Sequence, residues 1–448
     1  MARLFGTDGF RGRANDVITA DLAMDLCVAA AKVLTLSSTR PRLKAVIGRD
    51  PRASGEFLEA AVVAGLASAG VDVVRLGVLP TPGLAFLVTE LEADFGVMLS
   101  ASHNPMPDNG IKFFSHGGIK LPDQIEDLIE DELGKPWVRP IGADVGRVTD
   151  DYDAIDRYVH HLVASLGSER PLAGLKVVLD PANGAAWDTA IKAFHLAGAE
   201  VTAIHNTPTG LNINEDCGST HIESLQAAVP AVGAHFGIGL DGDADRCLAV
   251  DAAGCVVDGD QILAILAIAM KEQGRLHQDT VVATVMSNLG FFVAMKAHEI
   301  RVDTTKVGDR YVVESMNANG FTLGGEQSGH VVMSEYATTG DGTLTALHLA
   351  LQVVNSSRSL AELGSVMTRM PQVMINVSGV DRDRTNLDQG VVQAVAAAEI
   401  ELGSAGRVVL RPSGTEPLVR VMVEADTEDR ARSVAESLAE VVRTRLGQ

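Results

Sequence analysis

The chain has 448 residues, of which 46% are hydrophobic and 21% charged, as expected for a globular protein with a large core. Length alone suggests about three domains. Lysine and arginine number 37 against 58 aspartate and glutamate, a net charge of −21, which argues against a surface for nucleic acid or for an acidic membrane. Because cations are scarce, a local cluster of arginines is informative wherever it occurs.

Cysteine usage and the N-terminus predict a cytoplasmic protein. The cysteines Cys27, Cys217, Cys247 and Cys255 form no C-x-x-C pair and no zinc-finger spacing, so we expect buried thiols in a reducing compartment. Residues 1–13 lack the apolar segment of a signal peptide, and the apolar run 263–270 is too short to span a bilayer. We expect no membrane partner.

The N-terminal segment contains a glycine-flanked polar loop, GTDG at residues 6–9, followed by Arg11. Such a loop could bind an anion through backbone amides and the guanidinium group. It could equally be a tight turn that joins two strands, and the sequence leaves both possibilities open. Residues 16–36 predict a helix, because Thr19 is a start signal and apolar residues follow at helical spacing.

A strand–helix–strand unit then recurs three times, within residues 43–76, 175–205 and 281–304. Units of this spacing favour parallel-containing sheets covered by helices, so we expect three similar α/β domains in series. The first unit is followed by a predicted turn at Thr81-Pro82. The nine elements are expected at residues 43–48, 55–69, 71–76, 175–179, 186–197, 201–205, 281–285, 290–298 and 300–304.

From about residue 371 the pattern changes to that of a smaller α+β domain. Its strands are expected at residues 373–377, 407–410 and 418–424, and its helices at residues 390–399 and 428–446. We therefore expect four domains, with boundaries at residues 1–165, 166–259, 260–370 and 371–448.

The stretch at residues 95–105 combines a strand with a turn suited to chemistry. An apolar strand at 95–99 ends in the turn SASHNP, whose small residues allow a tight bend and whose Pro105 stops regular structure. A strand end that presents the hydroxyl of Ser102 beside the imidazole of His103 is where α/β proteins place nucleophiles. Serine-rich turns are usually only turns, so the significance of this one depends on the other motifs.

Residues 240–246, LDGDADR, place three carboxylates at alternate positions of one short loop. This density is electrostatically costly unless a hard cation neutralises it, and oxygen ligands favour Mg²⁺ over zinc or copper. A solvated acidic turn is the alternative. The loop is not an EF-hand, because Arg246 replaces the required glycine. Residues 237–242 fit G-x-G-x-x-G by letter, but an expected strand at 247–250 follows and the loop is anionic, so we reject dinucleotide binding.

The similar DGD at residues 258–260 opens an expected helix, where aspartate is an ordinary N-terminal cap, and we interpret it as structural and as a domain junction.

The third and fourth motifs suit a sugar phosphate. GGEQSGH at residues 324–330 offers several hydrogen-bonding groups on a glycine loop between apolar strands, which suits sugar hydroxyls or an amine; a polar hairpin turn is the alternative. RPSGT at residues 411–415, with Arg420 beyond it, offers hydroxyls, amides and two guanidinium groups for a phosphate. It does not match the P-loop, so hydrolysis of nucleoside triphosphates is not implied.

The four motifs occur in the same order as in the α-D-phosphohexomutases, and the chain resembles that family. The motifs are SHNP at 102–105, DGDADR at 241–246, GEQSGH at 325–330 and RPSGTEP at 411–417, and the resemblance runs over essentially the full chain from GTDG at 6–9. The identities in the third motif and the segment DNGIKF at 108–113 point to the glucosamine branch of the family.

The resemblance implies four domains around a central cleft and an active enzyme that is phosphorylated on Ser102. It implies exchange of phosphate between the 6- and 1-positions of glucosamine, through a hexose 1,6-bisphosphate that is both intermediate and activator. The product would feed UDP-N-acetylglucosamine and cell-wall synthesis. One Mg²⁺ per active site and sugar phosphate substrates are implied, in a monomer or homodimer that binds no nucleic acid.

The expected site residues follow from the motifs and the resemblance together. Cations near the metal would offset charge on the transferring phosphoryl group, the third motif would recognise sugar hydroxyls, and the fourth would hold the phosphate that is not reacting. The residues expected in catalysis are Ser102, His103, Arg11 and Lys112, and those expected to bind the metal are Ser102, Asp241, Asp243 and Asp245. The residues expected to bind the substrate are Arg246, Thr304, Gly308, Glu326, Ser328, Arg411, Ser413, Gly414, Thr415 and Arg420.

Three other functions stay open at this stage. One is a phosphomannomutase or phosphoglucomutase of the same family, since loop identities are weak evidence for one sugar. Another is a metal-dependent sugar phosphatase with Asp241 as nucleophile, although Asp245 does not fit the usual small residue there. The third is a non-catalytic sugar-phosphate sensor, which would need neither Ser102 nor the three aspartates. The roles of His103, His330 and Lys306 in proton transfer are not separated, and Asp50 has no assigned role.

Overall fold

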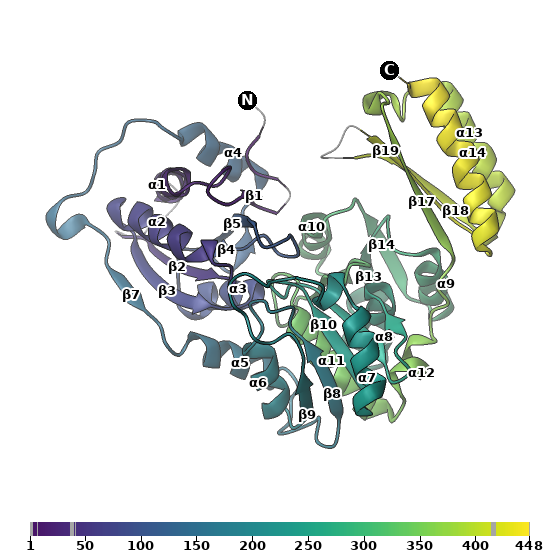
Figure 1. The fold of residues 1–448 in the computed structure, drawn as a ribbon, viewed down its shortest axis with the longest axis horizontal. Coiled ribbons are helices and arrows are strands. Elements are labelled where there is room, and N and C mark those ends of the chain that lie inside the picture. Colours follow the sequence, from purple (N-terminus) through teal and green to yellow (C-terminus); the bar gives the residue numbers. More distant parts are fainter. Residues whose placement is uncertain (1–2, 7, 36–39, 41, 414–417, 448) are drawn as a thin grey trace.

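The computed structural model describes residues 3–6, 8–35, 40, 42–413 and 418–447. These residues form four sheets, which the chain visits in order from the N-terminus to the C-terminus (Figure 1). The expected fold class is confirmed: three α/β units with mixed sheets are followed by a smaller α+β unit. Short 3-10 helices lie at Gly142–Asp144, Gly218–Thr220, His277–Asp279, Arg382–Arg384 and Gly403–Ala405.

The first unit contains a seven-stranded sheet. Its strands are β1 (Phe10–Arg13), β2 (Lys44–Arg49), β3 (Asp72–Val78), β4 (Phe95–Leu99), β5 (Asp108–Ser115), β6 (Ile119–Lys120) and β7 (Val148–Asp150). The order is β1-β5-β4-β2-β3-β7, with β6 paired to β5. Its helices are α1 (Ala20–Thr35), α2 (Ser54–Ser68), α3 (Thr81–Glu90) and α4 (Asp123–Glu132), and α5 (Ala154–Ala164) leads to the next unit.

The second unit has a five-stranded sheet of order β12-β11-β10-β8-β9. Its elements are β8 (Lys176–Asp180), α6 (Thr189–Leu196), β9 (Glu200–Ala203), α7 (Glu223–Val232), β10 (Phe236–Leu240), β11 (Cys247–Asp251) and β12 (Val256–Val257).

The third unit has a four-stranded sheet of order β14-β13-β15-β16. Its elements are α8 (Gly259–Glu272), β13 (Thr280–Thr284), α9 (Leu289–Ala297), β14 (Arg301–Thr305), α10 (Asp309–Asn319), β15 (Leu323–Gly325), β16 (Val331–Met333), α11 (Gly342–Ser356) and α12 (Leu360–Gly364). At the start of α8, Asp258 caps the helix in a capping box with Gln261, which confirms the structural interpretation of the second aspartate pair.

The three sheets share one local topology that positions the site. In each, a central strand (β2, β8 or β13) is parallel to one neighbour on either side, and the later of these neighbours (β4, β10 or β15) pairs antiparallel with the next strand along the chain. The loops that leave β4, β10 and β15 are the serine turn, the aspartate loop and the GEQSGH loop. Three of the four motifs thus occupy the same place in three copies of one unit.

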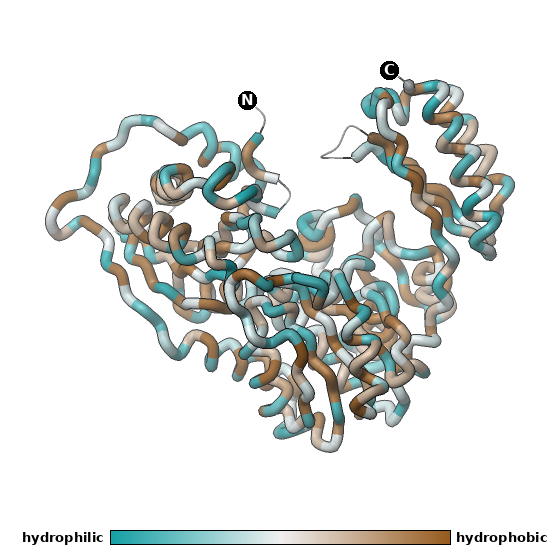
Figure 2. The backbone as a smooth tube through the Cα atoms, in the orientation of Figure 1, coloured by the Kyte–Doolittle hydropathy of each residue, from teal (hydrophilic) through white to brown (hydrophobic). Residues whose placement is uncertain are grey.

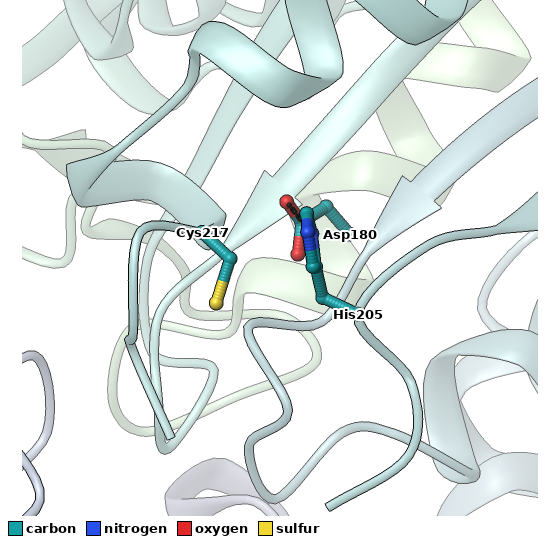
Figure 3. A group of neighbouring side chains, drawn as sticks. All are labelled: Asp180, His205 and Cys217. Atoms are coloured by element: carbon teal, nitrogen blue, oxygen red, sulfur yellow. Dashed lines mark hydrogen bonds and ion pairs between the residues drawn. The ribbon is translucent and has the colours of Figure 1, made fainter. Parts of the chain in front are cut away.

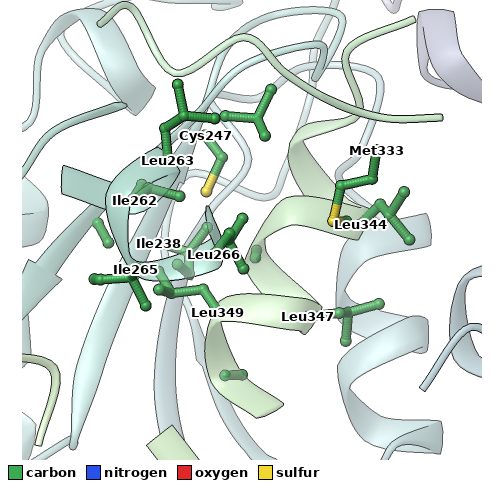
Figure 4. Close-up of a cluster of buried hydrophobic side chains, with 14 of the residues drawn as sticks. Ile238, Cys247, Ile262, Leu263, Ile265, Leu266, Met333, Leu344, Leu347 and Leu349 are labelled. Carbon is green, nitrogen blue, oxygen red and sulfur yellow. The ribbon is translucent and has the colours of Figure 1, made fainter. Parts of the chain in front are cut away.

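The second and third units share one hydrophobic core. Figure 4 shows side chains of β10 and β11, such as Ile238 and Cys247, among those of α8 and α11, such as Leu266 and Leu347, and all of these are buried. Tyr158 and Leu162 of α5 belong to the same cluster. In Figure 2 the hydrophobic colours run along many of the strands, whereas the helices alternate between hydrophobic and hydrophilic colours.

The C-terminal unit has its own core on an antiparallel three-stranded sheet. Its strands are β17 (Gln372–Ser378), β18 (Arg407–Pro412) and β19 (Leu418–Glu424), in the order β17-β19-β18. The helices α13 (Gln389–Leu402) and α14 (Glu428–Leu446) cover one face of this sheet (Figure 1). Along α14, Val434, Leu438 and Val442 are buried at a spacing of one helical turn.

One buried carboxylate joins the C-terminal unit to the third unit. Glu424 has no exposed surface and accepts hydrogen bonds from Asn288 Nδ2 at 3.0 Å and from the backbone N–H of Leu289 at 2.9 Å. Arg407 Nε donates to the same carboxylate at 2.6 Å. Elsewhere the C-terminal unit stands apart from the first unit (Figure 1).

All nine elements expected in the repeats occur, with ends shifted by at most three residues. Two local predictions are wrong. The first helix begins at Ala20 rather than residue 16, because Thr19 Oγ1 accepts a hydrogen bond from the Leu22 N–H and so occupies the cap position. The expected turn at Thr81-Pro82 begins α3, since proline lacks an N–H and is pre-organised for the first helical turn.

The structure also bears on the predictions about the cysteines and about membrane-spanning segments. Cys27, Cys217 and Cys247 are buried as expected, whereas Cys255 is exposed in the tight turn between β11 and β12. Within the described part of the chain, no helix combines the length and the apolar character that crossing a membrane requires.

Candidate active site

The serine turn lies at the centre of the site and places Ser102 in a constrained position. Ser102 follows β4, is 1% exposed and has a φ of 52°, a left-handed conformation that is uncommon for serine. Its backbone N–H donates to Ser100 Oγ at 2.9 Å. The hydroxyl donates to Asp241 Oδ2 at 2.6 Å, and His103 Nδ1 lies 3.3 Å from Oγ. The turn therefore aims this hydroxyl at the aspartate loop of the second unit.

A buried arginine, which the sequence did not single out, holds this turn. Arg52 is fully buried and donates to Asp50 Oδ2 at 2.9 Å, and Asp50 in turn accepts from Ser100 Oγ at 2.6 Å. The remaining guanidinium N–H groups donate to four backbone carbonyls within residues 102–108, at 2.6 to 3.0 Å. Asp50, unassigned from sequence, is thus a positioning residue. An Asp-Pro turn after the first strand of each of the first two repeats was the available signal.

The aspartate loop brings its three carboxylates together behind Ser102. Asp241, Asp243 and Asp245 are at most 3% exposed, and one oxygen from each lies within 4.8 Å of the others. A Cβ on Gly242 would lie 2.5 Å from the carbonyl oxygen of Ser102, so glycine is what allows the two loops to approach this closely.

The electrostatics of this triad fit a cation. Burial and the two neighbouring carboxylates raise the pKa of Asp241 well above its usual range, and burial together with Asp243 raises the pKa of Asp245. Among the described residues, nothing donates a hydrogen bond to Asp243 Oδ1 or to Asp245 Oδ1, although both oxygens are buried. Clustered carboxylates with buried oxygens that receive no hydrogen bond are the donor set of a hard divalent metal ion.

Lys112 and Asp8 place balanced charges beside the triad. Lys112 is 2% exposed and lies 2.8 Å from Asp243 Oδ2 and 2.9 Å from Asp8 Oδ2. Burial opposes ionisation of Asp243, but the ammonium group of Lys112 outweighs it and lowers the pKa of that carboxyl. Asp8 also pairs with Arg11 and Lys120, so the N-terminal loop contributes a carboxylate that organises cations. The loop is also a tight turn, in which the Gly6 N–H donates to the Gly9 carbonyl; Thr7 lies outside the described residues.

His103 is neutral in this surrounding. Burial, followed by the positive charges of Arg246 and Arg11, lowers the pKa of His103 to about 4. A neutral imidazole next to the Ser102 hydroxyl has a free nitrogen lone pair that accepts a proton.

A cleft of about 450 Å³ lies beside His103, where the first three units meet. The expected residues that line it are Arg11, His103, Asp245, Arg246, Gly308 and Glu326. Glu326 Oε1 accepts from the Gly308 N–H at 3.1 Å, so the third motif is anchored beside the cleft, and Ser328 lies half-buried in the same loop. Asp309 and His330 line it as well, and Asp309 pairs with Lys120 across the first and third units.

The remaining expected substrate residues lie elsewhere. Thr304 and Arg411 line a separate crevice of about 860 Å³ between the third unit and the C-terminal unit. Arg411 and Arg420 face each other on β18 and β19, and burial together with Arg420 lowers the pKa of Arg411. Ser413 is buried, and its N–H donates to the Leu418 carbonyl at 2.9 Å. Gly414 and Thr415 lie outside the described residues.

Family models described as Phosphoglucomutase/phosphomannomutase match the chain in all four units. The alpha/beta/alpha domains I, II and III match residues 2–136, 156–254 and 258–370, and the C-terminal domain matches residues 374–441.

The chain belongs to this family.

Curated relatives in the family align with the chain from end to end. The chain is 64% identical to the phosphoglucosamine mutase of Cutibacterium acnes over 448 residues and 62% identical to that of Streptomyces griseus over 456 residues, covering 100% of each chain in both cases.

Solved structures share the family fold. A phosphoglucomutase/phosphomannomutase family protein from Burkholderia thailandensis superposes with a TM-score of 0.84 at 24% identity, covering 99% of this chain and 97% of that chain. The N-acetylphosphoglucosamine mutase of Aspergillus fumigatus, in complex with GlcNAc-6P and magnesium, superposes with a TM-score of 0.70 at 18% identity, covering 99% of this chain and 96% of that chain.

Proposed function

We propose that the chain is a phosphoglucosamine mutase that interconverts glucosamine 6-phosphate and glucosamine 1-phosphate. The observation that carries the proposal is the hydrogen bond from the buried Ser102 hydroxyl to Asp241, whose neighbours His103 and Asp245 line a cleft together with Glu326. The name borne by relatives at 64% and 62% identity over the full chain supports the glucosamine substrate.

Ser102 is proposed to carry the transferring phosphoryl group as phosphoserine. The bond between phosphorus and Ser102 Oγ breaks as a bond forms to the free hydroxyl of the sugar phosphate, which yields the 1,6-bisphosphate. The hydroxyl proton passes to His103, whose neutral imidazole lies 3.3 Å from Oγ, and from there to Oγ as it leaves the phosphorus. After the bisphosphate reorients in the cleft, Ser102 Oγ attacks its other phosphate, and the Oγ proton passes back through His103 to the sugar oxygen that is released. A trace of hexose 1,6-bisphosphate would phosphorylate Ser102 in the same way and so act as activator.

Asp241, Asp243 and Asp245 are proposed to hold one Mg²⁺ together with a phosphoserine oxygen. The buried oxygens of Asp243 and Asp245 that receive no hydrogen bond from the described residues support this assignment. When bound, the ion would neutralise charge that builds up on the transferring group. Lys112, Arg11 and Arg246 supply the remaining positive charge around Ser102.

Substrate recognition is proposed to involve two separate parts of the molecule. Glu326, Ser328 and the Gly308 backbone would hydrogen-bond sugar hydroxyls at the cleft. The pair of guanidinium groups on β18 and β19, with residues 413–415, would hold the phosphate that is not reacting. Thr304 lies on the crevice between these two parts.

The C-terminal unit would then move toward the cleft to bring its arginines to the substrate. Its attachment through Glu424 to the third unit supports a hinge there. Small-angle scattering with and without glucosamine 1-phosphate is expected to show compaction on binding, and an unchanged radius of gyration would contradict the closure. The predicted domain boundaries at 165, 259 and 370, a cytoplasmic location and a monomeric or homodimeric state are kept as parts of this proposal.

The decisive experiment combines phosphosite mapping with turnover. The protein is incubated with glucosamine 6-phosphate, Mg²⁺ and a trace of glucose 1,6-bisphosphate, and we expect phosphate on Ser102 together with glucosamine 1-phosphate. Ser102→Ala is expected to abolish both. Far higher efficiency with mannose or glucose phosphates would assign the chain to the other activities of the family. Free phosphate, with an acyl phosphate on Asp241 that hydroxylamine releases, would overturn the mutase in favour of a phosphatase.

A further inference from the structure

A second group of potential metal ligands lies in the second unit, outside the cleft. Asp180 ends β8, His205 follows β9, and Cys217 precedes the 3-10 helix Gly218–Thr220. Figure 3 shows the three side chains as neighbours that come from these three segments. One ligand atom from each lies within 4.8 Å of the others. No spacing rule could find this group, because its members come from separate parts of the chain.

The charge of Asp180 is less compensated than that of its counterpart in the first unit. Asp50 and Asp180 both follow the first strand of their repeat in an Asp-Pro turn, and both are fully buried. Asp50 is paired with the permanently charged Arg52 at 2.9 Å. Over the described residues, the only ion-pair partner of Asp180 is His205, whose Nδ1 lies 2.9 Å away and which is charged only if protonated. Asp180 Oδ1 accepts a hydrogen bond from the Ala182 N–H at 2.9 Å and Oδ2 accepts one from the Gly218 N–H at 3.0 Å, so a cation would add the fixed positive charge that these neutral donors do not supply.

The chemistry of the neighbouring thiol points to the same kind of ligand. Cys217 is fully buried, and a carboxylate oxygen of Asp180 and an imidazole nitrogen of His205 each lie within 4.8 Å of its sulfur. A divalent cation in contact with sulfur would supply the missing positive charge and release the thiol proton to solvent. Thiolate, imidazole and carboxylate together are the ligands that zinc prefers, whereas Mg²⁺ prefers oxygen alone.

We propose that Asp180, His205 and Cys217 form a Zn²⁺ site that is distinct from the magnesium triad. The side chain of His205 is 31% exposed, so solvent reaches this side of the group, and a water molecule would complete the coordination. The site would tie the ends of β8 and β9 to the loop before the 3-10 helix.

That loop also contacts the serine turn, which gives the site a structural consequence. Asn214, three residues before Cys217, donates through Nδ2 to the carbonyls of Ser102 and Asn104 at 2.9 and 3.1 Å. On the other side, a Cβ on Gly218 would lie 2.4 Å from the carbonyl oxygen of Leu240, the residue before the aspartate loop. Zinc bound here would therefore stabilise the packing of both catalytic loops without touching the reacting groups.

The test measures metal binding directly, in a protein whose exposed thiol has been removed. Cys255→Ser serves as the parent, because Cys255 is exposed and could bind zinc adventitiously. Excess Mg²⁺ is present throughout to occupy the aspartate triad. After chelation and buffer exchange, we expect about one Zn²⁺ to bind per chain by competition with a chromophoric chelator, and Co²⁺ to give a thiolate-to-cobalt charge-transfer band in the near ultraviolet.

Variants of the ligands and a matched control complete the experiment. Cys217→Ser and His205→Gln are expected to weaken zinc binding by at least about 10- to 100-fold, and Cys217→Ser to abolish the cobalt band. His221→Gln, at an exposed histidine of the same segment, is expected to leave both unchanged. Zinc should also raise the unfolding temperature of the parent but not of Cys217→Ser. The proposal would be overturned if the parent protein bound no zinc, or if its cobalt complex lacked the thiolate band, and neither result depends on whether the variants fold. Equal zinc binding by Cys217→Ser and the parent would show that the metal binds elsewhere.

Discussion

Replacing Arg52 by alanine tests whether the serine turn depends on one buried guanidinium group. Arg52 lies in the Asp-Pro turn of the first unit and has no exposed surface. Its five hydrogen bonds connect Asp50 to the backbone of the loop that carries Ser102. Alanine removes all five and leaves a cavity behind.

The loss of stability in Arg52→Ala comes mainly from Asp50, the carboxylate that loses its ion-pair partner. Asn214 Nδ2 still donates to two of the four carbonyls, at 2.9 and 3.1 Å, and a backbone N–H still donates to a third, so few carbonyls are left without a donor. Asp50 becomes a buried charge whose remaining contacts are hydrogen bonds from neutral groups. Breaking a buried ion pair on one side costs about 3–5 kcal/mol, and we expect Arg52→Ala to destabilise the first unit by this amount.

The pH dependence of the defect has a defined sign. Burial raises the pKa of Asp50 and Arg52 opposes that rise, so the variant raises the pKa further. A carboxyl whose folded-state pKa lies above its unfolded value binds more protons when folded, and stability is then lost as pH rises through that folded pKa. The destabilisation should therefore be larger at about pH 8 than at about pH 5. Adding Asp50→Asn to Arg52→Ala should recover part of the loss, because the buried group can no longer ionise.

Native-state hydrogen exchange of the β4 amides measures this opening free energy separately from the other units. Phosphorylation of Ser102 by glucose 1,6-bisphosphate is measured alongside it, and about a 100-fold loss in rate is expected from displacement of the turn. Arg75→Ala is the control, since Arg75 is 43% exposed and its pair with Asp150 contributes less than about 1 kcal/mol. An Arg52→Ala protein that behaves like Arg75→Ala in both measurements would refute the reasoning.

Three further predictions concern carboxylates at the metal loop, the cleft and the C-terminal attachment. Asp245→Asn should stabilise the metal-free protein by up to about 1 kcal/mol, because it relieves repulsion with Asp241, and should remove the stabilisation by Mg²⁺. If Mg²⁺ raised the unfolding temperature of this variant as much as that of the parent, the metal assignment would be contradicted. Glu326→Gln should raise KM for glucosamine phosphates about tenfold with a smaller change in kcat, since it weakens ground-state contacts; steady-state kinetics with an unchanged KM would exclude that role. Glu424→Ala should remove the acceptor that Asn288 and Arg407 share and weaken attachment of the C-terminal unit by about 3 kcal/mol, measured as faster proteolysis before β17. Cleavage at the parental rate would argue against this hinge.

Much of the fold and the chemical motifs could be predicted from the sequence because both are local. Strand–helix–strand units have a characteristic spacing, so the repeats and their sheets follow from hydrophobic periodicity and turn residues. The serine turn, the aspartate loop and the GEQSGH loop are each contiguous, and each has a composition that suggests its chemistry. The sequence did not reveal that these loops leave the equivalent strand of each unit, since pairing order is a property of the sheet.

The tertiary structure alone decided which groups stabilise and neutralise those motifs. Arg52 acts on carbonyls about 50 residues away in sequence, and Asp8 compensates Lys112 from 104 positions away, contacts that periodicity cannot predict. It also separated Thr304 and Arg411 from the cleft that His103, Asp245 and Glu326 line. The group of Asp180, His205 and Cys217 exists because two parallel strands end beside one loop. Local sequence specifies which side chains a loop carries. Packing between distant segments determines the charge state of these side chains, their hydrogen-bond and ion-pair partners, and which cleft they line.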